Sequence, residues 1–268
     1  MHVHFLDPYR ARLSPIHVFE ARLKLILVLI FILTNTLLPM KAWPIYILMF
    51  SLVLAGEILS EVGVGYVLKR SILALPFALA ALPLLFTLPG SSLFNFTVGT
   101  WELSISQAGL ERFVGIALKS WISLQAAILL ASTTTFPDLL FAMRAIRIPR
   151  LLVSVFGLMW RYLFVLVDEA LRLMRARTAR SGQSDQPGLK SGGSLAWRAR
   201  VTGGMAGNLF LRGLERSDRI YMAMVSRGYD GEVRSLPMPR ISPMDWLVLV
   251  LGLILMGLLL TLGLVFWG

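Results

Sequence analysis

The sequence contains no cysteine, which excludes disulfide bonds, thiol catalysis and cysteine-ligated metal centres. Charged residues are also scarce, at 15% of the chain, whereas about a quarter of a soluble domain is charged. Of the three histidines, His2 and His4 lie beside the N-terminus with no third side-chain ligand in view, so we expect a solvated terminus there. We therefore predict neither a metal site nor any other cofactor.

Hydrophobic residues make up 56% of the 268 residues, and 26 Lys and Arg stand against 15 Asp and Glu. So apolar a composition indicates a polytopic membrane protein. The positive excess then marks cytoplasmic loops and anionic lipid headgroups, so we expect a lipid bilayer and not nucleic acid as a partner. The first 24 residues do not resemble a cleaved signal peptide. Arg22 and Lys24 directly precede an apolar run, which predicts a cytoplasmic N-terminus.

Five apolar stretches are predicted to cross the membrane, in an otherwise all-α fold. They are residues 25–38, 45–59, 71–88, 114–131 and 246–267. The last has 22 residues without a charge, close to the roughly 20 that a bilayer requires. Pro76 and Pro83 interrupt the third, as neighbouring helices permit in membranes. Between the third and fourth, near 93–106, apolar and polar residues alternate, and we expect a small external β-hairpin.

Three ionisable residues in or beside these stretches raise the question of chemistry within the membrane. Glu57 and Glu61 lie four apart and could form an acid–base pair or a cation site, but we favour a solvated cap at a helix end. Lys119 could line a substrate path, and we favour a side chain that snorkels to the outer surface. A polytopic membrane enzyme that uses these residues is the alternative function.

A long basic segment, residues 136–244, holds 17 of the 26 basic residues and is predicted to be cytoplasmic. We expect one long helix from residue 151 to Arg180, with its first half buried against the membrane bundle and its second half emerging as an arm. A sixth membrane span is the alternative for this helix. A loop over 182–207 and a second amphipathic arm over 208–226 follow.

The predicted organisation is thus a membrane bundle over 1–135, a coupling region over 136–244 and a final membrane helix over 245–268. Within the predicted loop, Gly188-Leu189-Lys190-Ser191 lacks the adjacent Gly-Lys pair of a phosphate-binding loop. We therefore do not expect the chain to bind ATP in that way.

An arginine among small residues ends each arm. Arg180 precedes Ser181 and Gly182, and Arg227 precedes Gly228. A guanidinium group offers five donors on a rigid fork, so it can bind in a polar groove of a partner. It can equally do no more than complement the helix dipole. The residues alone leave both explanations open.

Two groups of residues between 133 and 231 resemble a known family, and the resemblance covers essentially the whole chain. The first group is Thr133-Thr134, Pro137-Asp138-Leu139-Leu140, Pro149, Arg161-Tyr162, Asp168-Glu169-Ala170 and Arg172; the second is Leu214-Glu215-Arg216, Tyr221, Ala223-Met224 and Ser226-Arg227-Gly228-Tyr229-Asp230-Gly231. The pattern resembles the transmembrane T component of energy-coupling-factor (ECF) transporters, and most closely its cobalt-associated CbiQ branch.

The resemblance implies a role for each of these residues. The family's two Ala-Arg-Gly-like tripeptides, which contact ATPases, correspond to Ala179-Arg180-Ser181 and Ser226-Arg227-Gly228. Arg161, Glu169, Arg172, Glu215 and Arg216 would support the coupling helices. The small residues differ from the family tripeptide, since Ser181 replaces Gly in the first and Ser226 replaces Ala in the second.

The resemblance further implies a non-catalytic subunit of an ATP-driven importer in the cytoplasmic membrane of a prokaryote. Its partners would be two ATP-binding cassette ATPases and a CbiM-like substrate-binding S component. The implied cargo is cobalt, with nickel or a vitamin as alternatives. A third possibility from the charge alone is that the basic arms bind anionic lipid or RNA, an attraction that weakens steeply with salt.

Overall fold

A computed structural model describes residues 8–89, 92–98, 101–180, 194–231 and 241–267. His2, His4, the turn at 99–100, Ser181 and the motif at 188–191 lie outside these residues. The chain forms two compact units. One comprises Pro8–Ala145 and Met238–Gly268, and the other includes Ile146–Pro237.

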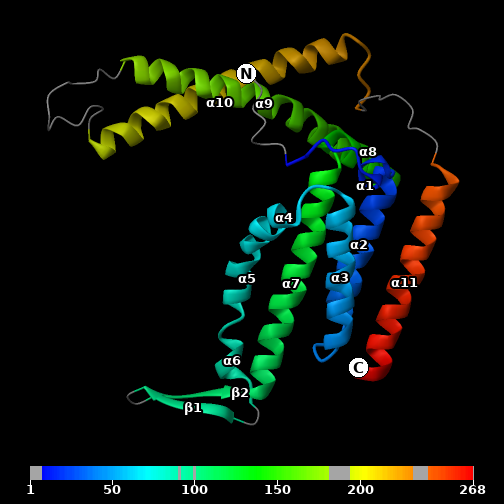
Figure 1. Cartoon of the computed structure of the whole chain (residues 1–268). Helices are drawn as coiled ribbons and strands as arrows, with labels where there is room; N and C mark the ends of the chain where they lie inside the picture. Colours follow the sequence, from blue (N-terminus) through cyan, green and yellow to red (C-terminus); the bar gives the residue numbers. More distant parts are fainter. Residues whose placement is uncertain (1–7, 90–91, 99–100, 181–193, 232–240, 268) are drawn as a thin grey trace. The chain divides into compact units, whose positions relative to one another are not determined.

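The first unit, which we call the bundle, is helical apart from one pair of strands (Figure 1). Its elements are α1 (Pro15–Val18), α2 (Ala21–Leu37), α3 (Trp43–Leu59), α4 (Val64–Ser71), η1 (Ile72–Ala74, a 3₁₀ helix), α5 (Leu75–Ala80), α6 (Leu84–Thr87), β1 (Ser92–Val98), β2 (Trp101–Ser106), α7 (Gln107–Thr133), α8 (Phe136–Ala145) and α11 (Pro243–Trp267). The second unit contains α9 (Arg150–Arg180) and α10 (Leu195–Val225).

The core of the bundle lies between α2, α3, α7 and α11. Phe31, Met49, Ile122 and Met256 bring one apolar side chain from each of these helices into a single buried cluster. On α11, a Cβ atom at Gly252 would lie 2.6 Å from Leu27 Cδ2 of α2. A glycine therefore permits the close approach of α11 to α2, as small residues do between membrane helices.

Reciprocal hydrogen bonds join α2 and α7. Asn35 Nδ2 donates to the Lys119 carbonyl at 3.0 Å and to Ser123 Oγ at 2.9 Å. Lys119 Nζ donates in return to the carbonyls of Thr36 at 2.8 Å and Leu38 at 2.6 Å, at the end of α2. The Lys119 ammonium group thus caps carbonyls that a helix end leaves without partners, a role that was not predicted. Whether the side chain also snorkels to the outer surface stays a prediction.

The third predicted span, residues 71–88, is not one helix. It is divided among η1, α5 and α6, and Pro83 is the N-cap of α6. Each proline removes a backbone donor and collides with the preceding turn. Pro76 and Pro83, seven residues apart, therefore break a stretch that apolar composition alone describes as continuous.

Glu57 also differs from the prediction, because its side chain is not solvated. The residue is fully buried, and within the described residues neither carboxylate oxygen has a hydrogen-bond partner. Gln125 of α7 is equally buried, and both of its side-chain polar atoms lack partners in that same part of the chain. Glu61, by contrast, is exposed and has a positive φ of 55°.

β1 and β2 pair antiparallel, with Val98 opposite Trp101 and Phe94 opposite Ile105. The pair lies where the alternating sequence predicts a hairpin. Its position outside the membrane stays a prediction.

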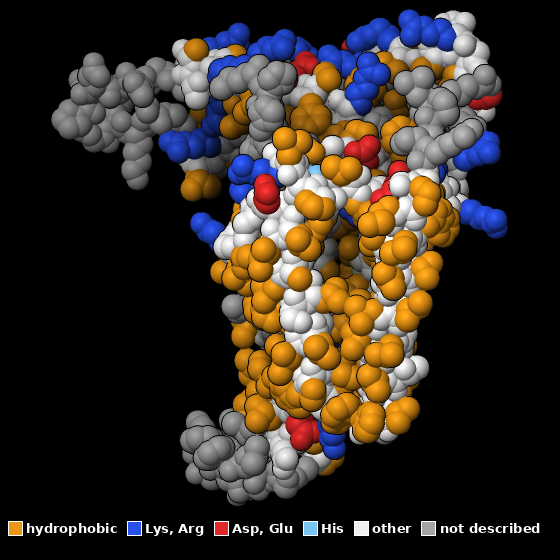
Figure 2. Space-filling view, turned by 45° about the vertical axis from the view of Figure 1, so that its right-hand side comes forward, with side chains coloured by type: hydrophobic (Ala, Val, Ile, Leu, Met, Phe, Trp, Pro, Cys, Tyr) orange, Lys and Arg blue, Asp and Glu red, His pale blue; other side chains and the backbone are white. Residues whose placement is uncertain are grey.

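By length and composition, three described helices could cross a membrane: α7, α9 and α11. α3 is apolar but shorter, and α2 has 17 residues. The predicted spans 114–131 and 246–267 lie within α7 and α11. Figure 2 shows apolar side chains over the visible face of the bundle, as a lipid-facing surface requires. The total of five or six spans stays a prediction.

α9 is the single long helix that the sequence predicts, but only two residues of its first half, Val153 and Ser154, are buried. Leu151, Val155 and Met159 are exposed. The packing of this half against the bundle stays a prediction. Its apolar composition also satisfies the criteria for a membrane span. The alternative of a sixth span therefore stays open.

α10 begins earlier than expected, which makes the predicted loop over 182–207 wrong from Leu195 onward. Ser194 caps the helix by accepting a hydrogen bond from the Trp197 amide at 3.2 Å. Three glycines in the first half of the helix, at 203, 204 and 207, made this stretch look like a loop. Each glycine destabilises a helix by up to about 1 kcal/mol relative to alanine. The helix nevertheless forms over 31 residues.

Candidate coupling site on α9 and α10

The first candidate arginine, Arg180, is the last residue of α9. Both Arg180 and Ala179 are exposed, and Ser181 follows outside the described residues. A cation in the last helical turn interacts favourably with the helix dipole. Within the described part of the chain, no hydrogen bond or ion pair holds the guanidinium group against the protein.

The second, Arg227, lies within a well-formed helix end. Gly228 has φ +79°, its amide donates to the Val225 carbonyl at 2.9 Å, and the Tyr229 amide donates to the Met224 carbonyl at 3.0 Å. These two bonds around a left-handed residue form a Schellman motif. Because only glycine adopts this conformation without strain, Gly228 fixes the backbone that presents Arg227. Ser226, Arg227 and Gly228 are all exposed.

The two arginines lie at opposite ends of the α9–α10 pair. Arg177, one turn before Arg180, donates from Nη1 to Thr202 Oγ1 near the start of α10 at 2.9 Å. Arg227 follows Thr202 by 25 residues on α10, which is about 38 Å at the helical rise per residue. Figure 1 shows the same arrangement, with the end of α9 and the end of α10 at the two far ends of the crossed helices. One compact partner surface cannot contact both.

Glu169 connects the two helices near their crossing. Its carboxylate accepts from Arg212 Nη1 and from Arg216 Nη2, each at 3.3 Å, and only 15% of its side chain is exposed. The predicted supporting residues Glu169 and Arg216 therefore meet. Arg161, Arg172 and Glu215 are exposed and do not join this cluster among the described residues.

Two contacts in this region were not predicted from the sequence. Arg212 lies one turn before Arg216 and binds the same carboxylate, a relation that the spacing of four indicates. The Arg177–Thr202 bond has no such signal, because Thr202 lies in the stretch that the glycines suggested was a loop.

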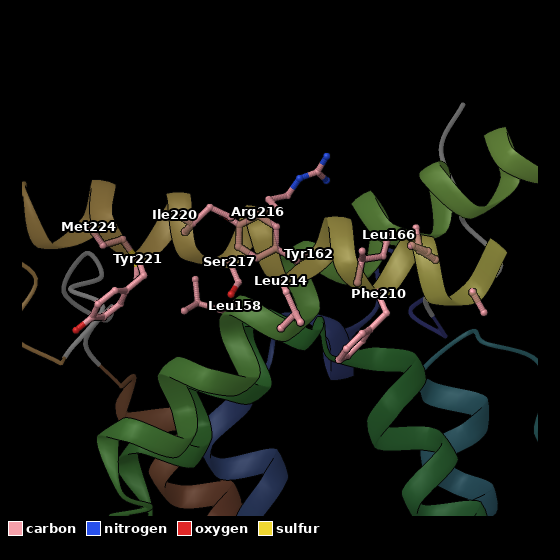
Figure 3. A pocket seen from close by; sticks show the side chains of 13 residues that line it. Leu158, Tyr162, Leu166, Phe210, Leu214, Arg216, Ser217, Ile220, Tyr221 and Met224 are labelled. Atoms are coloured by element: carbon pink, nitrogen blue, oxygen red, sulfur yellow. The ribbon is translucent and has the colours of Figure 1, made fainter. Parts of the chain in front are cut away.

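An apolar cavity of about 630 Å³ lies between α9 and α10. Leu158, Tyr162 and Leu166 of α9 and Phe210 and Tyr221 of α10 contribute to its lining. Figure 3 shows Phe210 and Tyr221 pointing to one side of α10 while the guanidinium group of Arg216 points to the other. The pair thus presents a polar, basic face and an apolar face.

We expect Glu169→Gln to loosen the α9–α10 crossing without unfolding the chain. The change removes both ion pairs but keeps the shape, and such partly exposed pairs contribute about 0.2–1 kcal/mol each. Two cysteines are introduced at exposed positions, Met174→Cys on α9 and Met222→Cys on α10. Because the chain has no other cysteine, a spin label reacts at these two positions alone. Double electron–electron resonance should then show a broader distribution of the distance between the two labels in Glu169→Gln than in the parent.

Glu215→Gln is the matched control, since Glu215 is an exposed acid on α10 without a described partner. Its distance distribution should match that of the parent. An equal broadening in both variants would show that Glu169 has no special part in holding the helices.

Comparison with known proteins connects this geometry to a family. The family model described as "Cobalt transport protein" (CbiQ) matches residues 13–238. The chain is 30% identical over 179 residues to the cobalt transport protein CbiQ of Rhodobacter capsulatus, covering 66% of this chain and 68% of that protein. It is 29% identical over 262 residues to the energy-coupling factor transporter transmembrane protein EcfT of Exiguobacterium sibiricum, covering 94% and 93%.

A putative fused cobalt transport protein CbiMQ of Methanocorpusculum labreanum is 27% identical over 271 residues, which cover 96% of this chain and 43% of the fusion. The match of the family model to most of the chain, together with these relatives and the apolar helices, shows that the chain is a multi-pass cell-membrane protein of the CbiQ family, the T components of energy-coupling-factor transporters.

Proposed function

We propose that the chain transmits the motion of two ATPase subunits to a separate substrate-binding membrane subunit, and that the transported substrate is cobalt. The names of the relatives above support cobalt as the cargo. The observation that carries the proposal is the presence of two exposed arginines at opposite ends of one helix pair. Each arginine can enter a groove of a different subunit, and the two subunits then act on the two ends of one rigid element. The α9–α10 pair lies on the cytoplasmic face in this proposal.

The S component is proposed to bind the apolar faces of α9 and α10. Phe210, Leu214 and Tyr221 leave about half or more of their area exposed on α10, at 66%, 48% and 56%. Large exposed apolar surface in a rim of charge is typical of an interaction site. The fusion of a CbiM segment to a CbiQ segment in one relative supports a CbiM-like subunit as the partner.

The test is reconstitution of this chain with its ATPases and S component in proteoliposomes. We expect ATP-dependent uptake of radioactive Co²⁺ that disappears when this chain is omitted. Uptake of Ni²⁺ in place of Co²⁺ would correct the cargo and keep the coupling role. ATP-driven uptake that is unchanged without the chain would refute the proposed function.

A further inference from the structure

The end of α7 is held by residues from near the N-terminus. α7 ends at Thr133, one extended residue caps it, and α8 begins at Phe136. The last four carbonyl groups of a helix have no partner within that helix. In α7, the Ser132 carbonyl accepts from the Arg10 amide at 2.9 Å. The next carbonyl, that of Thr133, accepts from Lys24 Nζ at 3.1 Å.

Lys24 is an unusual residue because it is buried. Only 7% of its area is exposed, although lysine is almost never buried unless it is paired. Its ammonium group is attracted by the carboxylates of Asp138, in the first turn of α8, and of Glu20, which precedes α2. Because Lys24 lies in the first turn of α2, this one side chain connects α2 to both of the helices that meet at the α7–α8 junction.

The start of α8 is fixed by its own cap. Thr135 Oγ1 donates to Asp138 Oδ2 and accepts from the Asp138 amide, the latter at 3.3 Å. α8 also packs against α2 along its length. The bonds of Lys24 and the cap of α8 therefore leave little freedom at the two residues between α7 and α8.

α8 is the part of the bundle from which the chain enters α9, through residues 146–149. In the proposed function a force is applied at Arg180, the last residue of α9. Along the chain, this force reaches the bundle through α8 first. The bundle can follow α9 only if α8 is firmly attached to it.

We propose that Lys24 is a positioning residue for transport, which fastens α8 to α2 and to the end of α7 so that a displacement of α9 moves the bundle as one body. This inference rests on the proposed function. Lys24 needs no contact with the ATPases or with the cargo for this role. Without its ammonium group, α8 would move against α2, and the motion of the ATPases would be lost at the junction.

The test is Lys24→Met, which keeps an unbranched side chain of similar length and removes the charge and the donor. The full complex is reconstituted in proteoliposomes, and the number of Co²⁺ ions taken up per ATP hydrolysed is measured. We expect this ratio to fall about tenfold, the scale on which loss of a hydrogen bond to a charged group shifts an equilibrium. ATP hydrolysis and co-purification of the ATPases should match the parent. A variant that was only less stable would yield less complex with an unchanged ratio.

Lys69→Met is the matched control, since it makes the same change at an exposed lysine on α4 and should keep the ratio of the parent. Asp138→Asn removes the charge on α8 and keeps an oxygen for Thr135. It should lower the ratio about two- to fivefold, as expected for a partly exposed ion pair. If Lys24→Met does not fold, Asp138→Asn tests the same expectation.

A second measurement needs no partner subunit. Spin labels on the full-length chain at Leu29→Cys of α2 and Ala145→Cys of α8, both exposed positions, report the distance between the two helices. Double electron–electron resonance should show a broader distance distribution for Lys24→Met than for the parent and for Lys69→Met.

An unchanged distance distribution in Lys24→Met would overturn the inference, because α8 would then be held without the ammonium group. An equal ratio of uptake to hydrolysis in Lys24→Met and Lys69→Met, beside a working parent, would overturn this inference alone. Uptake that proceeds without the chain would refute the proposed function, and with it the transport role of Lys24.

Discussion

Replacing Arg180 and Arg227 together by alanine is expected to abolish transport and the co-purification of the ATPases. Each side chain is exposed at a helix end and available to a partner. Truncation of a buried interfacial charge commonly costs about 2–5 kcal/mol. Each single change should therefore weaken ATPase binding at least tenfold, since about 1.4 kcal/mol corresponds to a factor of ten. Affinity purification of the complex and uptake assays measure the two effects.

Arg175→Ala with Arg219→Ala is the matched control. Both residues are exposed arginines on the same two helices, and the double change removes the same charge. Non-specific attraction to lipid or RNA would fall equally in both double variants and would depend steeply on salt. If the arginines instead bind in grooves of the ATPases, only the Arg180→Ala/Arg227→Ala variant should lose the ATPases. ATPases that still co-purify with the Arg180→Ala/Arg227→Ala variant would rule out the docking proposal.

Glu57→Leu is expected to stabilise the bundle. The parent carboxyl group is fully buried, and its oxygens lack hydrogen-bond partners among the described residues. A buried polar group without a partner costs about 1–3 kcal/mol in proteins, and an apolar side chain of similar size removes that cost. The midpoint of thermal unfolding in detergent should rise for Glu57→Leu. Glu57→Gln should raise it less, because an amide still requires partners.

Glu61→Gln provides the comparison, since Glu61 is exposed and its replacement should leave the midpoint nearly unchanged. A lower midpoint for Glu57→Leu would contradict the expectation and reveal a ligand for the carboxyl group, such as buried water. A higher midpoint with loss of uptake would assign Glu57 a part in transport. Intramembrane acids are often retained for function at the expense of stability.

Helix ends and helix interiors were not equally predictable from the sequence. The second arm was expected to end at residue 226, and the Schellman motif that ends it at Gly228 follows from local chemistry alone. The start of α10 was missed because three glycines resemble a loop when considered without the tertiary context. Packing against α9, which no local pattern shows, can offset their cost.

Polar residues inside the bundle were harder to place than apolar ones. Lys119 and Glu57 both lie in apolar stretches, and the sequence gives no register between helices. Lys119 proves to reach the carbonyls at the end of α2, whereas Glu57 is fully buried with no hydrogen-bond partner among the described residues. Which of two ionisable residues finds a partner depends on neighbours distant in sequence. Arg180 and Arg227 could be named from the sequence because a short motif identifies them, so no knowledge of tertiary contacts was needed.

The contacts described for α9 and α10 are distributed unevenly along α10. The hydrogen bond at Thr202 and the ion pairs at Arg212 and Arg216 all lie N-terminal to Ser217, while the final part up to Arg227 borders the apolar cavity. The described polar contacts between the two helices therefore all lie toward the Arg180 end. In the proposed mechanism, a pull on Arg180 would pass to α10 directly through these bonds, whereas a pull on Arg227 would reach α9 only along the length of α10.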